Sequence, residues 1–208
     1  MVRTGGNRLL KRQSKRISRW LGCSLATCAG AILNLIAAGP ALADLVQWKT
    51  NGHYYEVVVA PEGITWIEAR LAAQARGGYL ATLTSRPENL FVWSLISGRP
   101  NFWTTSSHAG KTDAVGPWIG LFQVRHQIQE PGGGWGWVSG EPFSYSNWAP
   151  GKPNNLEEIE DYGQYFIVHG SNDRATWNDL PNDSLRLTKV RAKRPVAYIV
   201  EYDTKPKR

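Results

Sequence analysis

The sequence predicts one α+β domain, in which two short helices come first and short strands separated by long loops follow. Two observations indicate the helices: Thr65 is followed by Glu68 and Ser85 by Glu88, and each pair has the spacing of a capping box. A third observation is a series of short runs rich in β-branched and aromatic residues, which favour strands. Residues 140–159, called the long loop below, show no periodic pattern, and so long a loop in a compact domain is usually functional.

The helices and turns follow in order along the chain. The first helix begins after Thr65 and ends at Gly77-Gly78, and the second begins after Ser85. Residues 98–116 are polar and aperiodic, which predicts a surface insertion. The glycines at 132–134 predict a hairpin turn rather than a phosphate-binding loop, because no Lys-Ser/Thr pair and no helix follow them. The predicted strands cover residues 54–59, 79–83, 118–122, 135–138, 162–168, 175–177 and 196–202.

Residues 1–43 are predicted to be a secretory signal peptide, followed by a single domain over residues 44–208. Seven Lys or Arg and no acidic residue lie in residues 1–19, an uncharged apolar run follows, and Ala41-Leu42-Ala43 fits a cleavage site. We expect the leader to be cleaved, because Gly39-Pro40 breaks the apolar run just before that site, and the domain to be exported to the periplasm or the cell exterior. The alternative is an uncleaved anchor helix, since the run is just long enough to span a bilayer.

Removal of the leader changes what the charge implies. The chain has 24 basic and 17 acidic side chains, and seven of the basic ones lie in the leader, so residues 44–208 carry 17 of each. A neutral domain gives no reason to expect nucleic acid as a partner. The locally basic residues 189–194 and 205–208 are predicted to be a solvated terminus, with contact to a membrane or cell wall as the alternative. Both cysteines, Cys23 and Cys28, lie in the leader, so the domain has no disulfide or cysteine–metal chemistry.

The titratable residues do not form a recognisable catalytic pattern. The four histidines are scattered without metal-ligand spacing (His53, His108, His126 and His169). No nucleophile elbow precedes a helix, which argues against a hydrolase. Glycosidases place two carboxyls across a cleft on a rigid scaffold, whereas the acidic run here, residues 157–161, sits in one loop. We therefore expect a binding protein and not an enzyme.

The order of these elements resembles a C-type lectin-like domain over residues 52–202. The resemblance is carried by the blocks TWIEARLAAQARGGYLATLTS, ENLFV, WIGL, WGWVSGEPFSYSNWAPGKPNN, EDYGQYF, WNDLP and YIVEY. The usual disulfide cysteines of the family are missing, and Tyr162 stands where one commonly follows Glu-Asp. Small, cysteine-free bacterial members of the family resemble this chain.

The resemblance implies a long loop that presents a calcium ion to a sugar. In members that bind sugar, a Glu-Pro-Asn triplet, a later Glu and an Asn-Asp pair after a Trp form the site, and the proline is typically cis. The matching positions here are Lys152-Pro153-Asn154, Glu160 and Asn178-Asp179. Calcium prefers oxygen ligands of this kind. The implied metal ligands are Asn154, Glu160, Asn178, Asp179 and Asp161, and the implied carbohydrate-binding residues are Asn154, Glu160, Asn178, Asp179, Lys152 and Trp148.

Lys152 departs from the pattern, because the family has a glutamate there. At a separation of ~5 Å, a +1 charge beside a +2 ion costs about 2 kcal/mol in water and about 7 kcal/mol at an effective dielectric of 20. Three alternatives stay open. The side chain could swing into solvent and leave a weak calcium site, its ammonium could pair with Glu160 or Asp179 and stand in for the ion, or Asp161, Glu157 or Glu158 could supply a replacement carboxylate.

Two tryptophans flank the implied site. Trp148 could pack under the long loop or stack on a sugar face, and the first interpretation is favoured. Trp177 is assigned to the core.

The sequence therefore predicts a secreted carbohydrate-binding module, with calcium as a cofactor if the site tolerates Lys152 and with no membrane span after the leader. The alternative is a metal-independent adhesion or recognition domain that binds protein through the same loops, because a fold does not settle a function. The Asn178-Asp179 pair favours sugar, since members without metal often lose it.

Overall fold

A computed structural model describes residues 44–124 and 129–207, all of which belong to one compact unit. The predicted leader with Cys23 and Cys28, and also His126, lie outside these residues. In the described part of the chain, no helix is both long enough and apolar enough to cross a bilayer.

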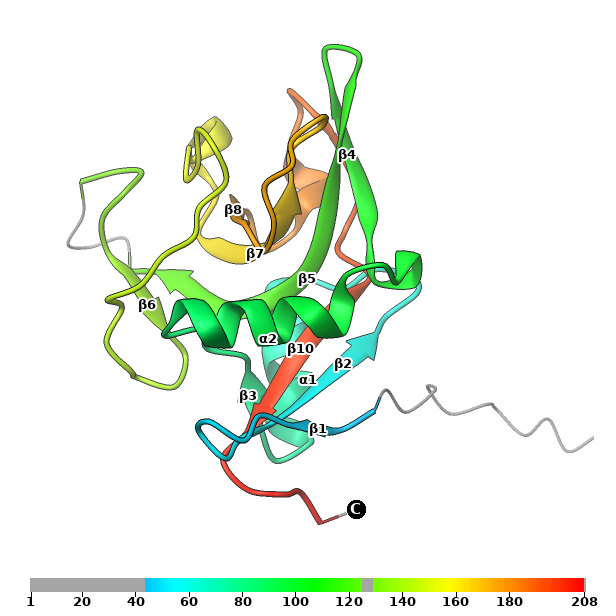
Figure 1. The fold of residues 1–208 in the computed structure, drawn as a ribbon. Helices are drawn as coiled ribbons and strands as arrows, with labels where there is room; N and C mark the ends of the chain where they lie inside the picture. The colour runs from blue at the N-terminus through cyan, green and yellow to red at the C-terminus, as the bar shows by residue number, and fades with distance from the viewer. Residues whose placement is uncertain (1–43, 125–128, 208) are drawn as a thin grey trace, which may run out of the picture. The chain divides into compact units, whose positions relative to one another are not determined.

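The first and last long strands of the domain pair with each other. Strand β2 (Tyr54–Val59) lies antiparallel to β10 (Ala197–Tyr202) over its whole length, and both consist largely of aromatic and β-branched residues. The short strand β1 (Val46–Gln47) extends β2, and β3 (Tyr79–Leu80) pairs with β10. Segments from both ends of the domain therefore lie side by side (Figure 1).

Strand β5 (Lys111–Gln123) organises the other half of the sheet. It lies parallel to β10 and antiparallel to β4 (Thr104–His108), β6 (Trp135–Trp137) and β7 (Tyr162–Ile167). Strand β8 (Trp177–Leu180) pairs with β7, and β9 (Arg191–Ala192) pairs with β4.

The two predicted helices are present. Helix α1 (Trp66–Ala75) has the complete capping box, because Thr65 accepts the N–H of Glu68 and the Glu68 carboxylate accepts the N–H of Thr65. Helix α2 (Arg86–Ile96) has half of it. Ser85 accepts the N–H of Glu88, but the Glu88 carboxylate bonds the N–H of Thr84 at 2.7 Å and points into the protein.

The core forms two layers, one on each face of the sheet. Side chains of alternate residues in a strand point to opposite faces; accordingly Tyr55 and Ile199 join the cluster packed by α2, and Val58 and Tyr198 join the cluster packed by α1. In Figure 1, α2 crosses in front of the sheet and α1 lies behind it. The α+β prediction is confirmed, and Trp177 is fully buried in the core as predicted.

The prediction of an aperiodic insertion at residues 98–116 is wrong. A short 3-10 helix, η1 (Pro100–Phe102), leads into a hairpin made of β4 and the first half of β5. Ala109 and Gly110, both with positive φ, form its turn. The polar Thr and Ser side chains of β4 are only partly buried, so no alternation of apolar and polar residues marks the strand.

Other boundaries differ by a few residues. Strand β3 stops at Leu80, and β8 begins at Trp177 rather than covering 175–177. The two-residue strands β1 and β9 were not predicted, because no periodicity can be read from two residues. The long loop is irregular as predicted, with one 3-10 turn, η3 (Leu156–Glu158), and a further 3-10 turn, η4 (Ser184–Arg186), precedes β9.

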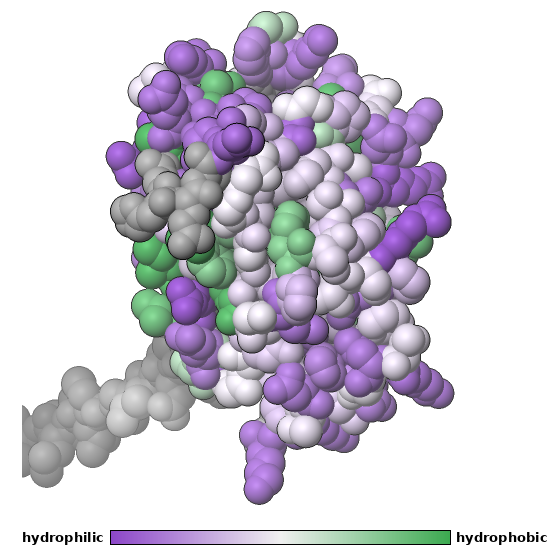
Figure 2. All heavy atoms as spheres, turned by 90° about the vertical axis from the view of Figure 1, so that its left-hand side faces the viewer, coloured by the Kyte–Doolittle hydropathy of each residue, from purple (hydrophilic) through white to green (hydrophobic). Residues whose placement is uncertain are grey.

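Hydrophobic residues on the surface are scattered. The face on the side of β6 is mostly hydrophilic or neutral, with its hydrophobic residues in small separate patches (Figure 2). The large exposed apolar side chains among the described residues are Ile67, Leu71, Leu90, Val124 and Leu185.

Candidate ligand-binding site

The long loop is held against the start of β8. The carbonyl oxygen of Asn147 accepts the N–H of Trp177 at 2.9 Å. The ring of Trp148 packs edge-on against Trp135 and Trp177, with centroid distances of 4.8 and 6.1 Å. Trp148 therefore packs under the loop, in keeping with the favoured interpretation of the sequence.

The tip of the loop has an unusual backbone. Asn155, Glu157 and Glu158 have φ values of 41°, 60° and 61°, which non-glycine residues adopt at an energetic cost and which cluster at functional sites. The carboxylate of Glu157 accepts the N–H groups of Thr188 and Lys189 at 2.8 and 2.6 Å. These bonds lower the pKa of Glu157. Glu157 therefore fastens the loop to residues 188–189 and is not a replacement carboxylate for the implied metal site.

Lys152 points along the loop toward Asn154. Its Nζ donates to Oδ1 of Asn154 at 2.6 Å and lies 5.4 Å from the centre of the Phe166 ring. The ammonium forms no ion pair within 4 Å with a carboxylate of the described residues. The Lys152–Pro153 peptide bond is cis, as the resemblance implies. The Lys152 ammonium therefore bonds Oδ1 of Asn154, the oxygen that the family pattern implies as a metal ligand.

Two buried carboxylates lie beneath the loop and bind its backbone. Oδ2 of Asp179 accepts the N–H groups of Asn154 and Asn155 at 2.9 and 2.7 Å, and Oε2 of Glu160 accepts the N–H of Leu156 at 2.7 Å. Burial, followed by the negative charge of Asp179, raises the pKa of Glu160 to about 8. Burial also raises the pKa of Asp179, whereas the positive charge of Lys152 acts to lower both values.

The remaining predicted site residues behave differently. The side chain of Asn178 is buried, its Nδ2 donates to the carbonyl oxygen of Asp179, and its Oδ1 has no hydrogen-bond partner in the described structure. Asp161 joins the sheet through its backbone, which bonds to Gln123 and Leu180. Neither Asp161 nor Trp148 lines the cavity beside the loop.

A cavity of about 350 Å³ opens beside these residues. Polar side chains of the long loop and β8 form one wall, apolar side chains of β5, β7 and β8 form the floor, and the β4–β5 hairpin forms the opposite wall. It is lined by Ser106, His108, Lys111, Asp113, Val115, Lys152, Asn154, Leu156, Glu160, Phe166, Val168, Asn178, Leu180, Leu187 and Val190. Mostly apolar cavities with a few polar groups are the usual form of small-ligand sites.

The sequence did not predict the hairpin wall. The sequence of residues 98–116 predicts a surface insertion and gives no link between the site and Ser106, His108 or Lys111, all of which line the cavity. The stretch 189–194, expected to be solvated, contributes Val190 to the cavity and Arg194 to an ion pair with Asp183 at 2.6 Å. Only the tertiary pairing of β4 with β9 brings these segments to the loop.

The residues at the implied metal position do not fit a calcium ion as they are arranged. Among the described residues, no three His, Cys, Asp or Glu side chains lie close enough to hold a metal. The Asn154 oxygen accepts the Lys152 ammonium, and Asp179 is engaged by backbone N–H groups. Calcium takes six to eight oxygen ligands, and an ammonium beside it would repel it.

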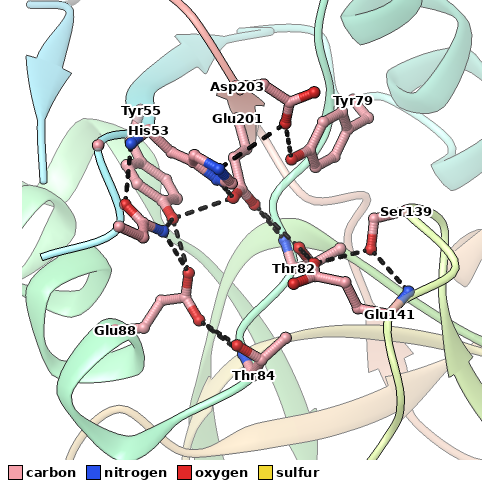
Figure 3. Close-up of polar contacts among 12 residues, drawn as sticks. His53, Tyr55, Tyr79, Thr82, Thr84, Glu88, Ser139, Glu141, Glu201 and Asp203 are labelled. Atoms are coloured by element: carbon pink, nitrogen blue, oxygen red, sulfur yellow. Dashed lines mark hydrogen bonds and ion pairs between the residues drawn. The ribbon is translucent and has the colours of Figure 1, made fainter.

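A second polar cluster lies near the chain ends and has a structural role (Figure 3). His53 Nδ1 lies 2.7 Å from Glu201 Oε1, and the hydroxyl of Tyr55 donates to Glu88 at 2.7 Å. The other oxygen of Glu201 accepts the N–H of Thr82 at 2.8 Å. The cluster joins β2, α2 and β10, so it stabilises the packing of elements distant in sequence.

The chain matches the family model of the Lectin C-type domain over residues 62–188. It is 32% identical over 135 residues to the perlucin-like protein of Mytilus galloprovincialis, a match that covers 64% of this chain and 70% of that protein. It is 32% identical over 114 residues to the low affinity immunoglobulin epsilon Fc receptor of Mus musculus, which covers 55% of this chain but 26% of the receptor.

One solved structure with a similar fold is the carbohydrate-recognition domain of the mouse scavenger receptor C-type lectin. It aligns with a TM-score of 0.49 at 20% identity, over 80% of this chain and 98% of that domain.

Proposed function

Because this chain belongs to the Lectin C-type domain family, we propose that it binds carbohydrate in the cavity beside the long loop, with the Lys152 ammonium in the place of a calcium ion. The observation that carries this proposal is the bond of 2.6 Å from Lys152 Nζ to Asn154 Oδ1, at the edge of a cavity of about 350 Å³. The ion pair of Lys152 with Glu160 or Asp179, which one of the three alternatives assumes, is not formed; we infer instead that the ammonium takes the place of the ion on the Asn154 oxygen.

The cavity lining offers polar groups for the hydroxyls of a sugar ring and apolar groups for its C–H face. An ammonium has three donors, so Lys152 can bond Asn154 and still donate to sugar hydroxyls. Glu160 and Asn178 add polar groups on the same wall, and Phe166 and Leu180 offer an apolar floor for the C–H face of the ring. The backbone bonds of Asp179 hold Asn154 in place without a metal.

We further propose that the domain binds without catalysing a reaction. The two carboxylates that line the cavity, Glu160 and Asp113, accept the backbone N–H groups of Leu156 and His169, so both hold the backbone in place. Residues 1–43 would direct export and be removed before Asp44, so that binding takes place in the periplasm or outside the cell; the intact mass of the exported protein checks the cleavage.

A glycan array probed with the purified protein in calcium and again in EDTA tests the proposal. We expect the same sugars to be bound in both. Lys152→Ala should weaken binding at least about tenfold, since a bond from a charged group is lost, while Lys205→Ala, an exposed lysine far along the chain, should have no effect. Lys152→Glu restores the family triplet and should make binding depend on calcium.

Two outcomes would contradict the proposal. If EDTA abolishes binding by the unaltered protein, calcium is required and Lys152 does not replace it. If no glycan binds in either condition, the metal-independent protein-binding alternative is favoured.

A further inference from the structure

A second cavity lies on the other face of the same three strands. It has a volume of about 390 Å³ and includes Trp93, Arg99, Trp103, Thr105, Ala114 and Ile167 in its lining. Ala114 of β5 and Ile167 of β7 are register partners, and the next pair along these strands, Val115 and Phe166, lines the cavity beside the long loop.

The strand β4 shows the same alternation. Ser106 and His108 line the first cavity and Thr105 lines the second, which Thr104, the first residue of the strand, also reaches. Because successive side chains of a strand point to opposite faces, the two cavities are separated by the sheet β4–β5–β7. The second cavity is therefore independent of Lys152 and the long loop.

Two indole rings line the second cavity together with the apolar residues Pro100, Ala114 and Ile167. Trp93 and Trp103 lie edge to face, with centroids 5.6 Å apart and an interplanar angle of 74°. Nε1 of Trp103 donates to the carbonyl oxygen of Ile96 at 3.1 Å. Trp93 is partly exposed, and its Nε1 has no acceptor within the described residues and is not among their buried polar atoms without a partner, so it can donate to a ligand.

Donors and hydroxyls surround these rings. Arg99 makes no ion pair with any residue that the structure describes; its guanidinium lies 5.9 Å from the Phe102 ring. Thr105 is exposed at the rim and adds a hydroxyl. Arg99 is exposed, so a ligand hydroxyl can replace water as an acceptor of its guanidinium, which a purely apolar group cannot do.

We propose that this cavity is a second carbohydrate site, which binds a pyranose ring with equatorial hydroxyls. Such a ring has a C–H face that can lie against the tryptophans, and its hydroxyls are directed outward to Trp93 Nε1, Arg99 and Thr105. Glucose-type rings in β linkage have this form. The site does not depend on the proposed function of the first cavity.

The adjacent residues Thr105 and Ser106 provide a matched pair of blocking variants. Thr105→Arg places a long side chain over the second cavity, and Ser106→Arg places it over the first. The readout is the indole N–H signal of Trp93 in NMR spectra of the ¹⁵N-labelled protein, assigned by its loss in Trp93→Phe. The probe is a β-1,4-linked glucose trisaccharide at millimolar concentration.

We expect the trisaccharide to shift the Trp93 signal in the unaltered protein and in Ser106→Arg, but not in Thr105→Arg. Trp93→Phe keeps the apolar ring and loses the donor, so it should weaken binding about three- to tenfold, followed on the Trp103 signal. Spectra whose other signals are unchanged show that a variant is folded.

Three results would overturn the proposal. The first is no shift of the Trp93 signal in the unaltered protein. The second is a shift that persists in Thr105→Arg. The third is a shift caused by free indole at the same concentration but not by the trisaccharide, which would make the cavity a site for apolar groups. If Lys152→Ala does not change binding on the glycan array, the site beside the long loop is contradicted, but the NMR results for the second cavity are unaffected. The two proposals are therefore tested independently.

Discussion

The charged side chains of the two polar clusters in this domain make different kinds of contact. Beside the long loop, Lys152 supplies the only cation lying on the Asn154 oxygen among the described residues, and two acidic side chains support the loop backbone. At the chain ends, His53 is the group that faces the buried carboxylate of Glu201 at 2.7 Å. The two clusters differ in this respect, because the Lys152 ammonium bonds an amide oxygen whereas the His53 ring faces a carboxylate.

His53 should make the stability of the domain depend on pH. Burial alone lowers the pKa of His53, but the hydrogen bond and charge of Glu201, with Asp203 and Glu141, outweigh it and raise the pKa above its usual value near 6.5. Burial raises the pKa of Glu201 as well. A pKa raised by folding gives stability that is complete below the unfolded-state pKa and is lost as the pH rises through the folded-state value.

We therefore expect the free energy of unfolding to fall as the pH rises from 6 toward 9, as measured by urea denaturation. His53→Gln should flatten this slope above pH 6.5, whereas His169→Gln, an exposed histidine of a turn, should leave it as it is. An unchanged slope in His53→Gln would mean that the imidazole does not gain protons on folding.

At the scale of elements, the β4–β5 hairpin and the long loop define the binding surface together. The hairpin gives a side chain to each cavity from neighbouring positions of β4, and the long loop closes one of them. The loop itself is fixed at three points: by Asp179, by Glu160, and by Glu157 through the N–H groups of Thr188 and Lys189.

Loss of the Glu157 contact should loosen the loop and the segment beside it together. In Glu157→Ala, the amide protons of Thr188 and Lys189 should exchange about tenfold faster, because a charged acceptor is removed from both. Hydrogen exchange followed by NMR measures this. Glu62→Ala, an exposed glutamate outside the loop, serves as the control, and equal exchange in both variants would show that Glu157 does not fasten the loop.

The elements also show what the sequence could predict and why the rest escaped. Both helices were identified because caps and apolar faces are local signals, and the strands of the core because they are strongly apolar. The β4–β5 hairpin was not predicted because the residues of β4 do not alternate between apolar and polar. Ser106 and Thr105, which lie on this strand, were therefore not predicted as cavity residues. The resemblance located Lys152, Asn154, Glu160 and Asn178 on one cavity, but the bond from Lys152 to Asn154 depends on loop geometry that no spacing gives.

At the scale of the whole molecule, stability depends on the pair β2 and β10, with a core layer on each face. Ile199, in the middle of β10, is fully buried opposite Val57. We expect Ile199→Ala to lower the free energy of unfolding by about 2–5 kcal/mol in urea denaturation, which is the usual cost of such a cavity.

Leu185→Ala is the matched control, because Leu185 is 58% exposed and substitutions of that kind change stability by about 0.5 kcal/mol or less. A loss in Ile199→Ala no larger than in Leu185→Ala would show that β10 is not part of the cooperative core.

The pairing of β2 with β10 also sets the order of events during synthesis. Val59 and its partner Ala197 are about 140 residues apart, and ribosomes add ~5–20 residues per second. Strand β2 therefore waits about 7 to 28 s for the strand that completes its hydrogen bonds. For that time, its Val57 and Tyr55 side chains have no finished core to enter, and the growing chain stays accessible to chaperones.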